Sequence, residues 1–317
     1  MSSKSKTLLI IGGTGFFAKS ILDYIFNYSL LKNIKKVLLL SRGNNKIKIN
    51  YKSKKKIKII NIYGDISKLK KIPFADYVIY CAIIHNYKQD HKAVCNYYKL
   101  AKKYHYKSKI LYTSSGAIYG RQPTHIDKIK ENYFYLNKRI NFSNNSKNIY
   151  STSKLKSEKI FKKLSGLGIK VSIARCFAFV GKHLPREKNY AVGNFIENII
   201  KNKTIEVNSN HEVIRSYMYA DDLVRWLFKI LCSANDKCPI YNVGSDSAIS
   251  IFKLADLLSK KYNILLSHKN KNCNFIDRYI PNINKAKKEL GLSIKYSNLE
   301  GVIKTIKLLK KKNEKTN

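Results

Sequence analysis

The chain has 317 residues, of which 44% are hydrophobic, as in a globular protein with room for one large domain or two smaller ones. Its 62 basic and 20 acidic residues give a formal net charge of +42, which would suit nucleic acid or an anionic membrane. However, the basic residues are mostly lysines spread over nearly every segment, and Lys, Asn, Ile and Tyr are abundant together, as in an A/T-rich genome. We therefore predict a solvated lysine-rich surface and no specific nucleic-acid partner, with a functional basic patch as the alternative.

The cysteines and the apolar runs bear on the compartment. The six cysteines form no Cys-x-x-Cys pair and no spacing suited to zinc, so we expect buried thiols, a reducing environment and no metal site. No apolar run approaches the ~20 residues that a membrane span needs, and the N-terminus lacks the long apolar core of a secretory signal. The expected protein is soluble and cytoplasmic, without a membrane partner.

The first half of the chain alternates strand-like and helix-like segments. Short apolar runs predict strands at residues 7–13, 36–40, 56–63, 76–82, 109–115 and 170–177. Helix-length segments lie between most of them, at 16–31, 90–104 and 148–165. This alternation predicts an α/β fold with a Rossmann-type, doubly wound parallel sheet.

The pattern loosens after Gly181, where a smaller α/β region is expected. Residues 193–203 and 219–231 look helical, and 204–207 look extended. Residues 240–244 are a candidate strand that returns to the main sheet, and Ser250 is the expected cap of a helix over 250–262. We divide the chain where the pattern changes, into residues 1–181 and 182–317. No Pro/Gly-rich linker separates the two parts, so we expect them to be joined closely and not tethered.

The first strand is followed by the loop "GGTGFFA" (12–18). Gly13, Gly15 and Ala18 fit the G-x-G-x-x-G/A arrangement, in which glycine permits a tight turn and a close approach to a pyrophosphate. A tight turn without a ligand is the alternative. We predict that Gly12, Gly13, Gly15, Phe16 and Phe17 contact a dinucleotide.

The end of the second strand indicates which dinucleotide is bound. No acidic residue occurs between Tyr24 and Gly64, although an NAD enzyme usually places a carboxylate there for the ribose 2′-hydroxyl. Ser41 and Arg42 could instead bind a 2′-phosphate, so NADP is favoured and NAD is the alternative. Further predicted contacts after the third and fourth strands are Asp65, Ile66 and Ala82.

A tyrosine with a lysine four residues later, in "YSTSK" (150–154), is the candidate catalytic pair. Chance alone predicts ~4 such pairs in a chain this rich in both residues, and the sequence contains four: Tyr28/Lys32, Tyr51/Lys55, Tyr98/Lys102 and Tyr150/Lys154. Only Tyr150 opens the helix after the fifth strand, on the ligand-binding side of such a sheet.

With these motifs the chain resembles an extended short-chain dehydrogenase/reductase of the NAD(P)-dependent nucleotide-sugar epimerase/dehydratase family. The resemblance runs from about residue 7 to 292 and rests on "GGTGFFA", "GDI", "YTSSGAIYG", "YSTSK", "ARCFAFVG", "RSYMYADDL" and "KAKKELGL". It implies an NAD(P)-binding domain over 1–181 and a nucleotide-sugar-binding region over 182–317. It also implies a homodimer.

The resemblance assigns chemistry to three side chains. A tyrosine hydroxyl has an ordinary pKa of ~10, and a lysine ammonium one helical turn away lowers it enough for proton exchange. Tyr150 would exchange the proton, and Lys154 would tune it and hold the nicotinamide ribose. Ser115 would hydrogen-bond the reacting sugar oxygen, with Ser114 as the fallback.

The reaction is narrowed by departures from the family pattern. The 4,6-dehydratases carry Asp-Glu where this chain has Gly116 and Ala117, so we reject dehydration. NADPH-dependent reduction of a nucleotide-activated 4-keto-6-deoxyhexose, of the CDP-abequose and dTDP-fucose synthase type, is favoured for glycan precursor supply. A 4-epimerase with retained NAD is the alternative. A non-catalytic dinucleotide sensor or scaffold with a polyanion-binding surface is the third hypothesis.

The nucleotide half of the substrate is assigned to the second part of the chain. Arg215 matches the family's diphosphate-binding arginine, and Arg278 is the predicted second one, because a guanidinium fork suits diphosphate oxygens. Asn194 is a candidate near the base.

Overall fold

The computed structural model describes residues 5–28, 33–43, 57–84, 86–133, 146–186, 190–269 and 275–313. The chain packs as two compact units, each assembled from separate segments. The first comprises Met1–Gly120, Phe134–Cys176 and Val224–Tyr241. The second comprises Arg121–Tyr133, Phe177–Leu223 and Asn242–Asn317. These units describe packing, so the functional division at residue 181 stays a prediction.

A seven-stranded sheet forms the centre of the first unit, in the order β11-β6-β5-β4-β1-β2-β3. Its strands are β1 (Lys6–Ile11), β2 (Ile34–Ser41), β3 (Lys58–Tyr63), β4 (Tyr77–Tyr80), β5 (Lys109–Ser115), β6 (Lys170–Cys176) and β11 (Ile240–Val243). Neighbouring strands from β3 through β6 all pair in parallel. The strand order reverses between β1 and β4, which confirms the predicted doubly wound, Rossmann-type sheet.

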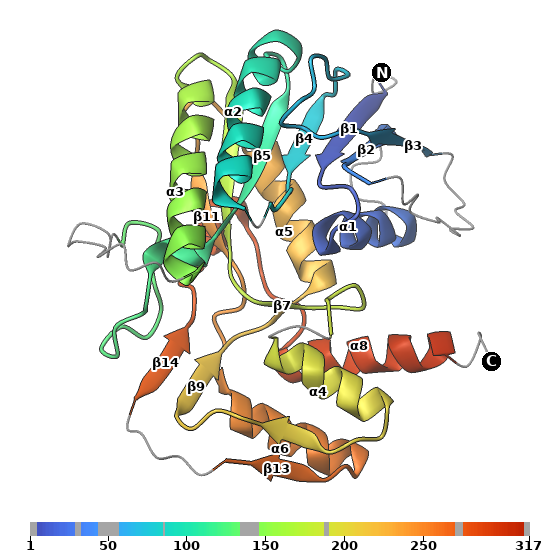
Figure 1. The fold of residues 1–317 in the computed structure, drawn as a ribbon, viewed down its shortest axis with the longest axis vertical. Helices are drawn as coiled ribbons and strands as arrows, with labels where there is room; N and C mark the ends of the chain where they lie inside the picture. The colour runs from blue at the N-terminus through green and yellow to red at the C-terminus, as the bar shows by residue number, and fades with distance from the viewer. Residues whose placement is uncertain are drawn as a thin grey trace. The chain divides into compact units, whose positions relative to one another are not determined.

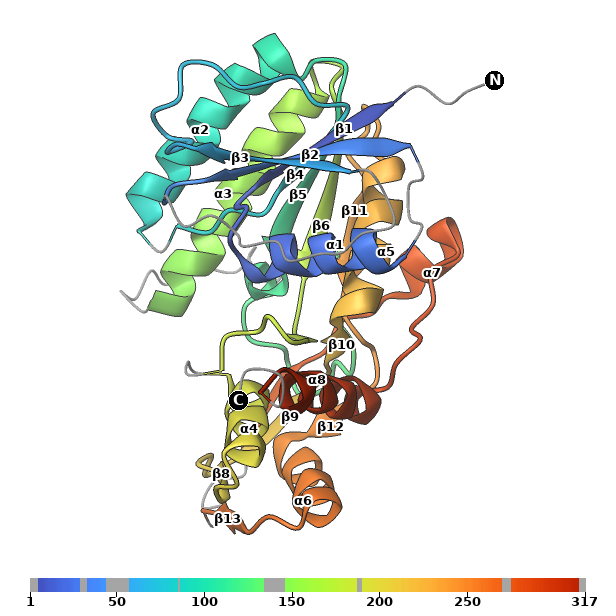
Figure 2. The same ribbon diagram turned by 90° about the vertical axis from the view of Figure 1, so that its right-hand side faces the viewer.

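Helices cover both faces of this sheet. In Figures 1 and 2, α2 (Tyr87–Tyr104) and α3 (Ser146–Ser165) lie together on one face, and α1 (Phe16–Asn27) and α5 (Ala220–Cys232) lie on the other. Asn86 caps α2 by accepting a hydrogen bond from Gln89 N at 3.1 Å. Under α2 and α3 the core is aromatic, with the Tyr112 and Phe161 rings stacked at 4.3 Å between centroids.

The second unit contains three small sheets. Its strands are β7 (Phe179–Val180), β8 (Ile205–Val207), β9 (Glu212–Arg215), β10 (Met218–Tyr219), β12 (Ile249–Ser250), β13 (Leu266–His268) and β14 (Ile276–Tyr279). Strands pair as β10-β7, β13-β8 and β12-β9-β14. A second apolar core lies under α4 (Ala191–Ile200), α6 (Ile251–Tyr262) and α8 (Asn298–Asn313). The unit also contains α7 (Asn284–Leu290). Ser250 caps α6, as predicted, by accepting from Lys253 N at 3.0 Å.

None of the described helices combines the length and the apolar character that crossing a membrane requires. Within the same part of the chain, no three His, Cys, Asp or Glu side chains gather as metal ligands would.

Candidate active site

Two glycines of the loop after β1 are required by packing alone. Gly12 has φ +104°, and a Cβ there would lie 2.7 Å from the backbone N of Ala82, which follows β4. A Cβ on Gly13 would lie 2.9 Å from Leu39 Cβ on β2. The loop therefore sits tightly against the carboxyl ends of β2 and β4, and Gly12 lies next to Ala82. Their contact with a dinucleotide stays a prediction.

Gly15 occupies the position from which an anion could be bound. A Cβ there would meet only Gly12 O, at an ordinary 3.5 Å, so packing does not explain this glycine. It is the N-cap of α1, where no side chain caps the helix and no acidic residue lies in the first turn, which Phe16 and Phe17 begin. The N–H groups of that turn lack intrahelical partners, so a pyrophosphate fits here both chemically and electrostatically.

The residues predicted to meet the adenosine half cluster at the ends of β2 and β3. Ser41 ends β2, Arg42 is exposed beside it, and Asp65 follows β3. The pKa of the Asp65 carboxyl lies below its ordinary value: partial burial acts to raise it, but hydrogen bonds from Ser67 and the charge of Arg42 outweigh burial. Arg42 thus has a carboxylate neighbour as well as access to solvent. Ile66, by contrast, is buried in the core.

Tyr150 and Lys154 lie one turn apart on α3 in different surroundings. Tyr150 is 36% exposed, whereas Lys154 is only 3% exposed. The Lys154 ammonium lies 5.2 Å from the Tyr112 ring centroid and 5.9 Å from that of Tyr150. Tyr112 is itself fixed by its stack on Phe161, so the lysine has a rigid aromatic platform.

The protonation state of Lys154 follows from these surroundings. Burial acts to lower the pKa of its ammonium, but the influence of Tyr112, Tyr150 and Asp90 outweighs burial and raises the pKa above its ordinary value. Burial raises the pKa of Tyr112 to about 12, against the lowering effect of Lys154. Lys154 is therefore a permanent positive charge at neutral pH, next to a neutral Tyr112.

The two candidate serines at the end of β5 differ in their hydrogen bonds. Ser115 Oγ accepts from Ala117 N at 3.2 Å and caps the short 3-10 helix η1 (Gly116–Tyr119). A hydroxyl that accepts this bond still has its hydrogen to donate. Ser114 Oγ is buried and has no hydrogen-bond partner within the described part of the chain. Both hydroxyls can therefore donate, and the choice of Ser115 over Ser114 stays a prediction.

A buried ion pair that the sequence did not reveal ties this region together. Arg175 on β6 donates to both carboxylate oxygens of Glu158 on α3, at 3.1 and 2.9 Å. It also donates to the Tyr119 hydroxyl of η1 at 2.8 Å. All three residues are at most 2% exposed. The available signals were the rarity of arginine and the placement of Glu158 one turn after Lys154.

The arginines predicted to bind a diphosphate lie on neighbouring strands of the second unit. Arg215 donates to Asp277 Oδ2 at 2.6 Å, and Arg278 is ion-paired with Asp127. The parallel register of β9 and β14 aligns Arg278 with Ile214 and Tyr279 with Arg215. Because side chains alternate along a strand, the two arginines leave opposite faces of this small sheet. Their joint action on one diphosphate stays a prediction.

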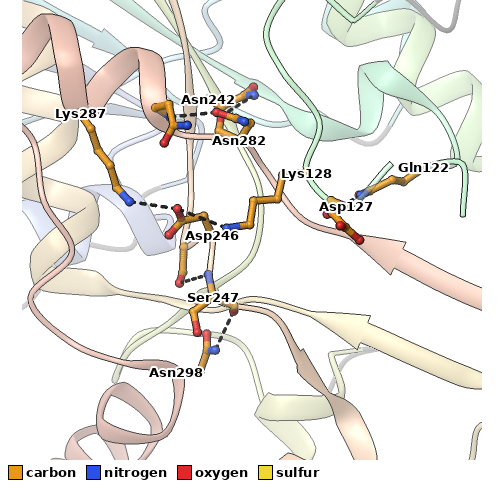
Figure 3. A network of polar contacts seen from close by, with 11 residues as sticks. Gln122, Asp127, Lys128, Asn242, Asp246, Ser247, Asn282, Lys287 and Asn298 are labelled. Atoms are coloured by element: carbon orange, nitrogen blue, oxygen red, sulfur yellow. Dashed lines mark hydrogen bonds and ion pairs between the residues drawn. The ribbon is translucent and has the colours of Figure 1, made fainter. Parts of the chain in front are cut away.

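A polar network fixes the loops beside Arg278 (Figure 3). Asp246 pairs with Lys287 at 2.9 Å and with Lys128 at 3.6 Å. The Asn242 amide donates to the backbone oxygens of Ile129 and Asn282, at 2.8 and 3.1 Å. Segment 121–133 is therefore held against the rest of the second unit. Asn194 is exposed on α4, and its predicted contact with the base stays a prediction.

Comparison with known proteins gives a family match and a curated relative. The model of the NAD dependent epimerase/dehydratase family matches residues 8–244. A dTDP-D-glucose 4,6-dehydratase of Dictyostelium discoideum is 27% identical in an alignment of 270 residues that covers 78% of this chain and 60% of that protein. The chain thus spans about 60% of the length of this curated relative. The rejection of dehydration finds no support here, because this relative is named a dehydratase.

Solved structures with the same fold cover nearly the whole chain. Pal from Bacillus thuringiensis has a TM-score of 0.77 at 22% identity, over 96% of this chain and 99% of that one. A UDP-glucose 4-epimerase from Thermotoga maritima, solved with UDP-glucose, has a TM-score of 0.75 at 18% identity, over 97% and 99%. A dTDP-glucose 4,6-dehydratase from Bacillus anthracis, solved with NAD, has 0.76 at 16%, over 98% of both chains.

Proposed function

The chain belongs to the NAD-dependent epimerase/dehydratase family, and from this premise we propose that it performs nicotinamide-dependent redox chemistry at C4 of a nucleotide-activated sugar. Within that class we propose the NADPH-dependent reduction of a 4-keto-6-deoxyhexose for glycan precursor supply. One observation carries the proposal. A buried, charged Lys154 lies one turn from a half-exposed Tyr150, on a helix that packs against the strand ending in Ser115.

Each of these side chains has a distinct task in the proposed reaction. The bound cofactor would supply a hydride to C4 of the sugar. Tyr150 is exposed enough to reach a substrate and would give its proton to O4. Ser115 would donate to the same oxygen, since its acceptor side is already engaged by Ala117 N. Lys154 would keep a positive charge beside the tyrosine and hold the nicotinamide ribose.

The preference for NADPH rests on the end of β2. Arg42 is an exposed guanidinium next to Ser41, and the segment from Tyr24 to Gly64 has no carboxylate for a ribose 2′-hydroxyl. The competing role of Arg42 is to neutralise Asp65, whose pKa it helps to lower. NAD is therefore the alternative cofactor, in keeping with the family's description.

In the second unit we propose Arg215 as the main diphosphate ligand, with Arg278 and Asn194 as further contacts to the nucleotide. Support for Arg215 comes from its guanidinium, which the side chain and backbone oxygen of Asp277 already orient, at 2.6 and 2.7 Å. A guanidinium group held in this way loses less conformational freedom when it binds phosphate oxygens. A homodimer remains part of the proposal.

A 4-epimerase is the second candidate function. Its support is that the same trio serves an enzyme that removes and returns a hydride, and that structures of this fold include a UDP-glucose 4-epimerase. Dehydration has the curated relative in its favour. Against dehydration stand Gly116 and Ala117, which begin η1 and carry no group able to act as acid or base.

A substrate panel separates these reactions. The purified protein is mixed with NADPH or NADH and dTDP-4-keto-6-deoxyglucose, or its CDP and UDP counterparts, and cofactor absorbance is followed. We expect oxidation of NADPH in preference to NADH with one of these sugars. Constant absorbance throughout, together with C4 inversion of a UDP-hexose, would identify an epimerase. A 4-keto product from dTDP-glucose would identify a dehydratase.

A further inference from the structure

A buried carboxylate lies beside the candidate catalytic turn and has no role in the reaction as described so far. Asp90, in the first turn of α2, is only 4% exposed. Its Oδ2 accepts from Ser153 Oγ at 2.8 Å, and its Oδ1 accepts from Ile84 N at 3.3 Å. Burying an ionised carboxylate is costly unless hydrogen bonds and an opposite charge compensate for it. The chain retains this group although it has only 20 acidic residues.

The contact with Ser153 places Asp90 at one particular turn of α3. Ser153 lies between Tyr150 and Lys154 in sequence and is itself only 6% exposed. Asp90 is thus bonded to the turn that carries both predicted catalytic side chains. The hydrogen bond joins α2 to α3, two helices that pack side by side on the same face of the sheet (Figure 1).

We propose that Asp90 is a positioning residue for the proposed reaction: it anchors the Tyr150–Lys154 turn through Ser153 and serves as the buried counter-charge of the Lys154 ammonium. This inference rests on the proposed function, since it concerns the same site.

The groups around Lys154 leave Asp90 as the source of negative charge. The titratable neighbours that act on this lysine include Tyr112 on β5, Tyr150 on α3, Cys81 just after β4 and Cys176 on β6. Burial raises the pKa of both thiols, that of Cys81 to about 12, and Tyr112 is likewise neutral at pH 7. Tyr80 on β4 and Tyr112 also face Asp90, and their pKa values are raised by burial and by the carboxylate.

The test separates the charge of Asp90 from its hydrogen bond. Asp90→Asn keeps the shape: its amide oxygen can accept from Ile84 N, and its NH2 can donate to Ser153 Oγ, because a hydroxyl also accepts. Ser153→Ala removes the hydrogen bond and keeps the charge. The matched control is Asp222→Asn, since Asp222 is a fully buried first-turn carboxylate of α5 that accepts from Lys295 N and Tyr296 N.

The readouts are NADPH affinity, from nicotinamide fluorescence, and kcat/KM, both measured from neutral to alkaline pH. In Asp90→Asn, burial of Lys154 is no longer opposed by a carboxylate, so its charge is lost at lower pH. We expect the alkaline decline of both quantities to move to lower pH. Ser153→Ala should lower kcat at all pH values without this movement, and Asp222→Asn should leave the profile in place.

The outcomes distinguish this inference from the proposed function. Superimposable NADPH-binding profiles for Asp90→Asn and wild type would overturn the counter-charge role, whether or not turnover is found. Suppose that the NADPH-binding profile of Asp90→Asn shifts to lower pH but the wild type turns over none of the sugars. That result would support the counter-charge role of Asp90 and overturn the proposed reaction. Failure of the wild type to bind NADPH or NADH would overturn both. A circular-dichroism spectrum unlike that of the wild type would show that Asp90→Asn does not fold normally. Ser153→Ala then carries the test, and an unchanged kcat in that variant would overturn the role of Asp90 as the anchor of the Tyr150–Lys154 turn.

Discussion

Tyr150 and Lys154 differ from another pair with the same spacing in how the lysine is buried. Tyr98 and Lys102 lie on α2 with the ammonium 5.6 Å from the ring centroid, close to the 5.9 Å of the Tyr150 pair. Lys102 is exposed to solvent, where its charge is screened, whereas Lys154 is buried. Spacing alone predicts the two pairs equally well, and the surroundings separate them.

The difference can be tested with one matched pair of variants. Tyr150→Phe removes the proposed proton donor and should lower kcat by about 10²–10⁴-fold with little change in KM, which is the range for a lost general acid. Tyr98→Phe removes the same hydroxyl from the other pair and should retain wild-type kcat. Steady-state kinetics with the substrate found in the panel checks both. Equal activity of Tyr150→Phe and wild type would remove Tyr150 from the chemistry.

At the same scale, the residues that sequence reasoning missed are acidic ones. Asp90 carries no local signature, because a carboxylate is usually exposed and nothing in the neighbouring sequence marks it as buried. For Glu158 the sequence offered only its placement one turn after Lys154. Tyr150, Lys154 and Ser115 could be proposed because each lies at a defined point of a strand–helix alternation. The partners that hold them are brought in by tertiary packing, from α2, β6 and η1.

At the level of elements, one buried ion pair joins three parts of the candidate site. Arg175 connects β6 to α3 through Glu158 and to η1 through Tyr119. Removing one partner of such a pair leaves an uncompensated charge in the interior. This ion pair therefore helps to fix the helix that carries Lys154 relative to the 3-10 helix that follows Ser115.

Glu158→Ala should lower the free energy of unfolding of the first unit by about 3–5 kcal/mol. The measurement is urea denaturation followed by Trp226, the single tryptophan, which is fully buried in α5. Asp76→Ala is the control in the same unit: Asp76 pairs with Lys6 at 2.7 Å with both side chains part-exposed. It should cost no more than about 2 kcal/mol, from that ion pair and one backbone hydrogen bond. Equal losses for both variants would contradict the account.

The elements themselves were predictable to different degrees. The strands of the main sheet have apolar runs of four to eight residues, and their predicted positions agree with the structure to within a few residues. In the small sheets of the second unit, the predicted extended segment 204–207 matches β8, and the other strands were not predicted. Strands such as β7, β10 and β12 have two residues each, too few for any alternation, and they form by pairing with distant segments.

At the scale of the whole molecule, the charge of +42 has no partner in the proposed reaction. A lysine-rich surface favours anionic sugar nucleotides by general attraction and does not select among them, so selection is assigned to the arginines. Non-specific, salt-sensitive binding to polyanions is expected in dilute buffer. The homodimer and the cytoplasmic location stay predictions, because they depend on partners and compartments outside this single chain.

The central claim is that the chain moves a hydride from NADPH to C4 of a nucleotide sugar. The most direct measurement uses NADPH carrying deuterium at both positions of nicotinamide C4, with a 4-keto-6-deoxyhexose nucleotide as substrate. The account predicts one deuterium at C4 of the product and one NADP⁺ formed per sugar reduced. Recovery of the unchanged 4-keto sugar with no NADP⁺ formed, or a reduced sugar without deuterium at C4, would contradict it.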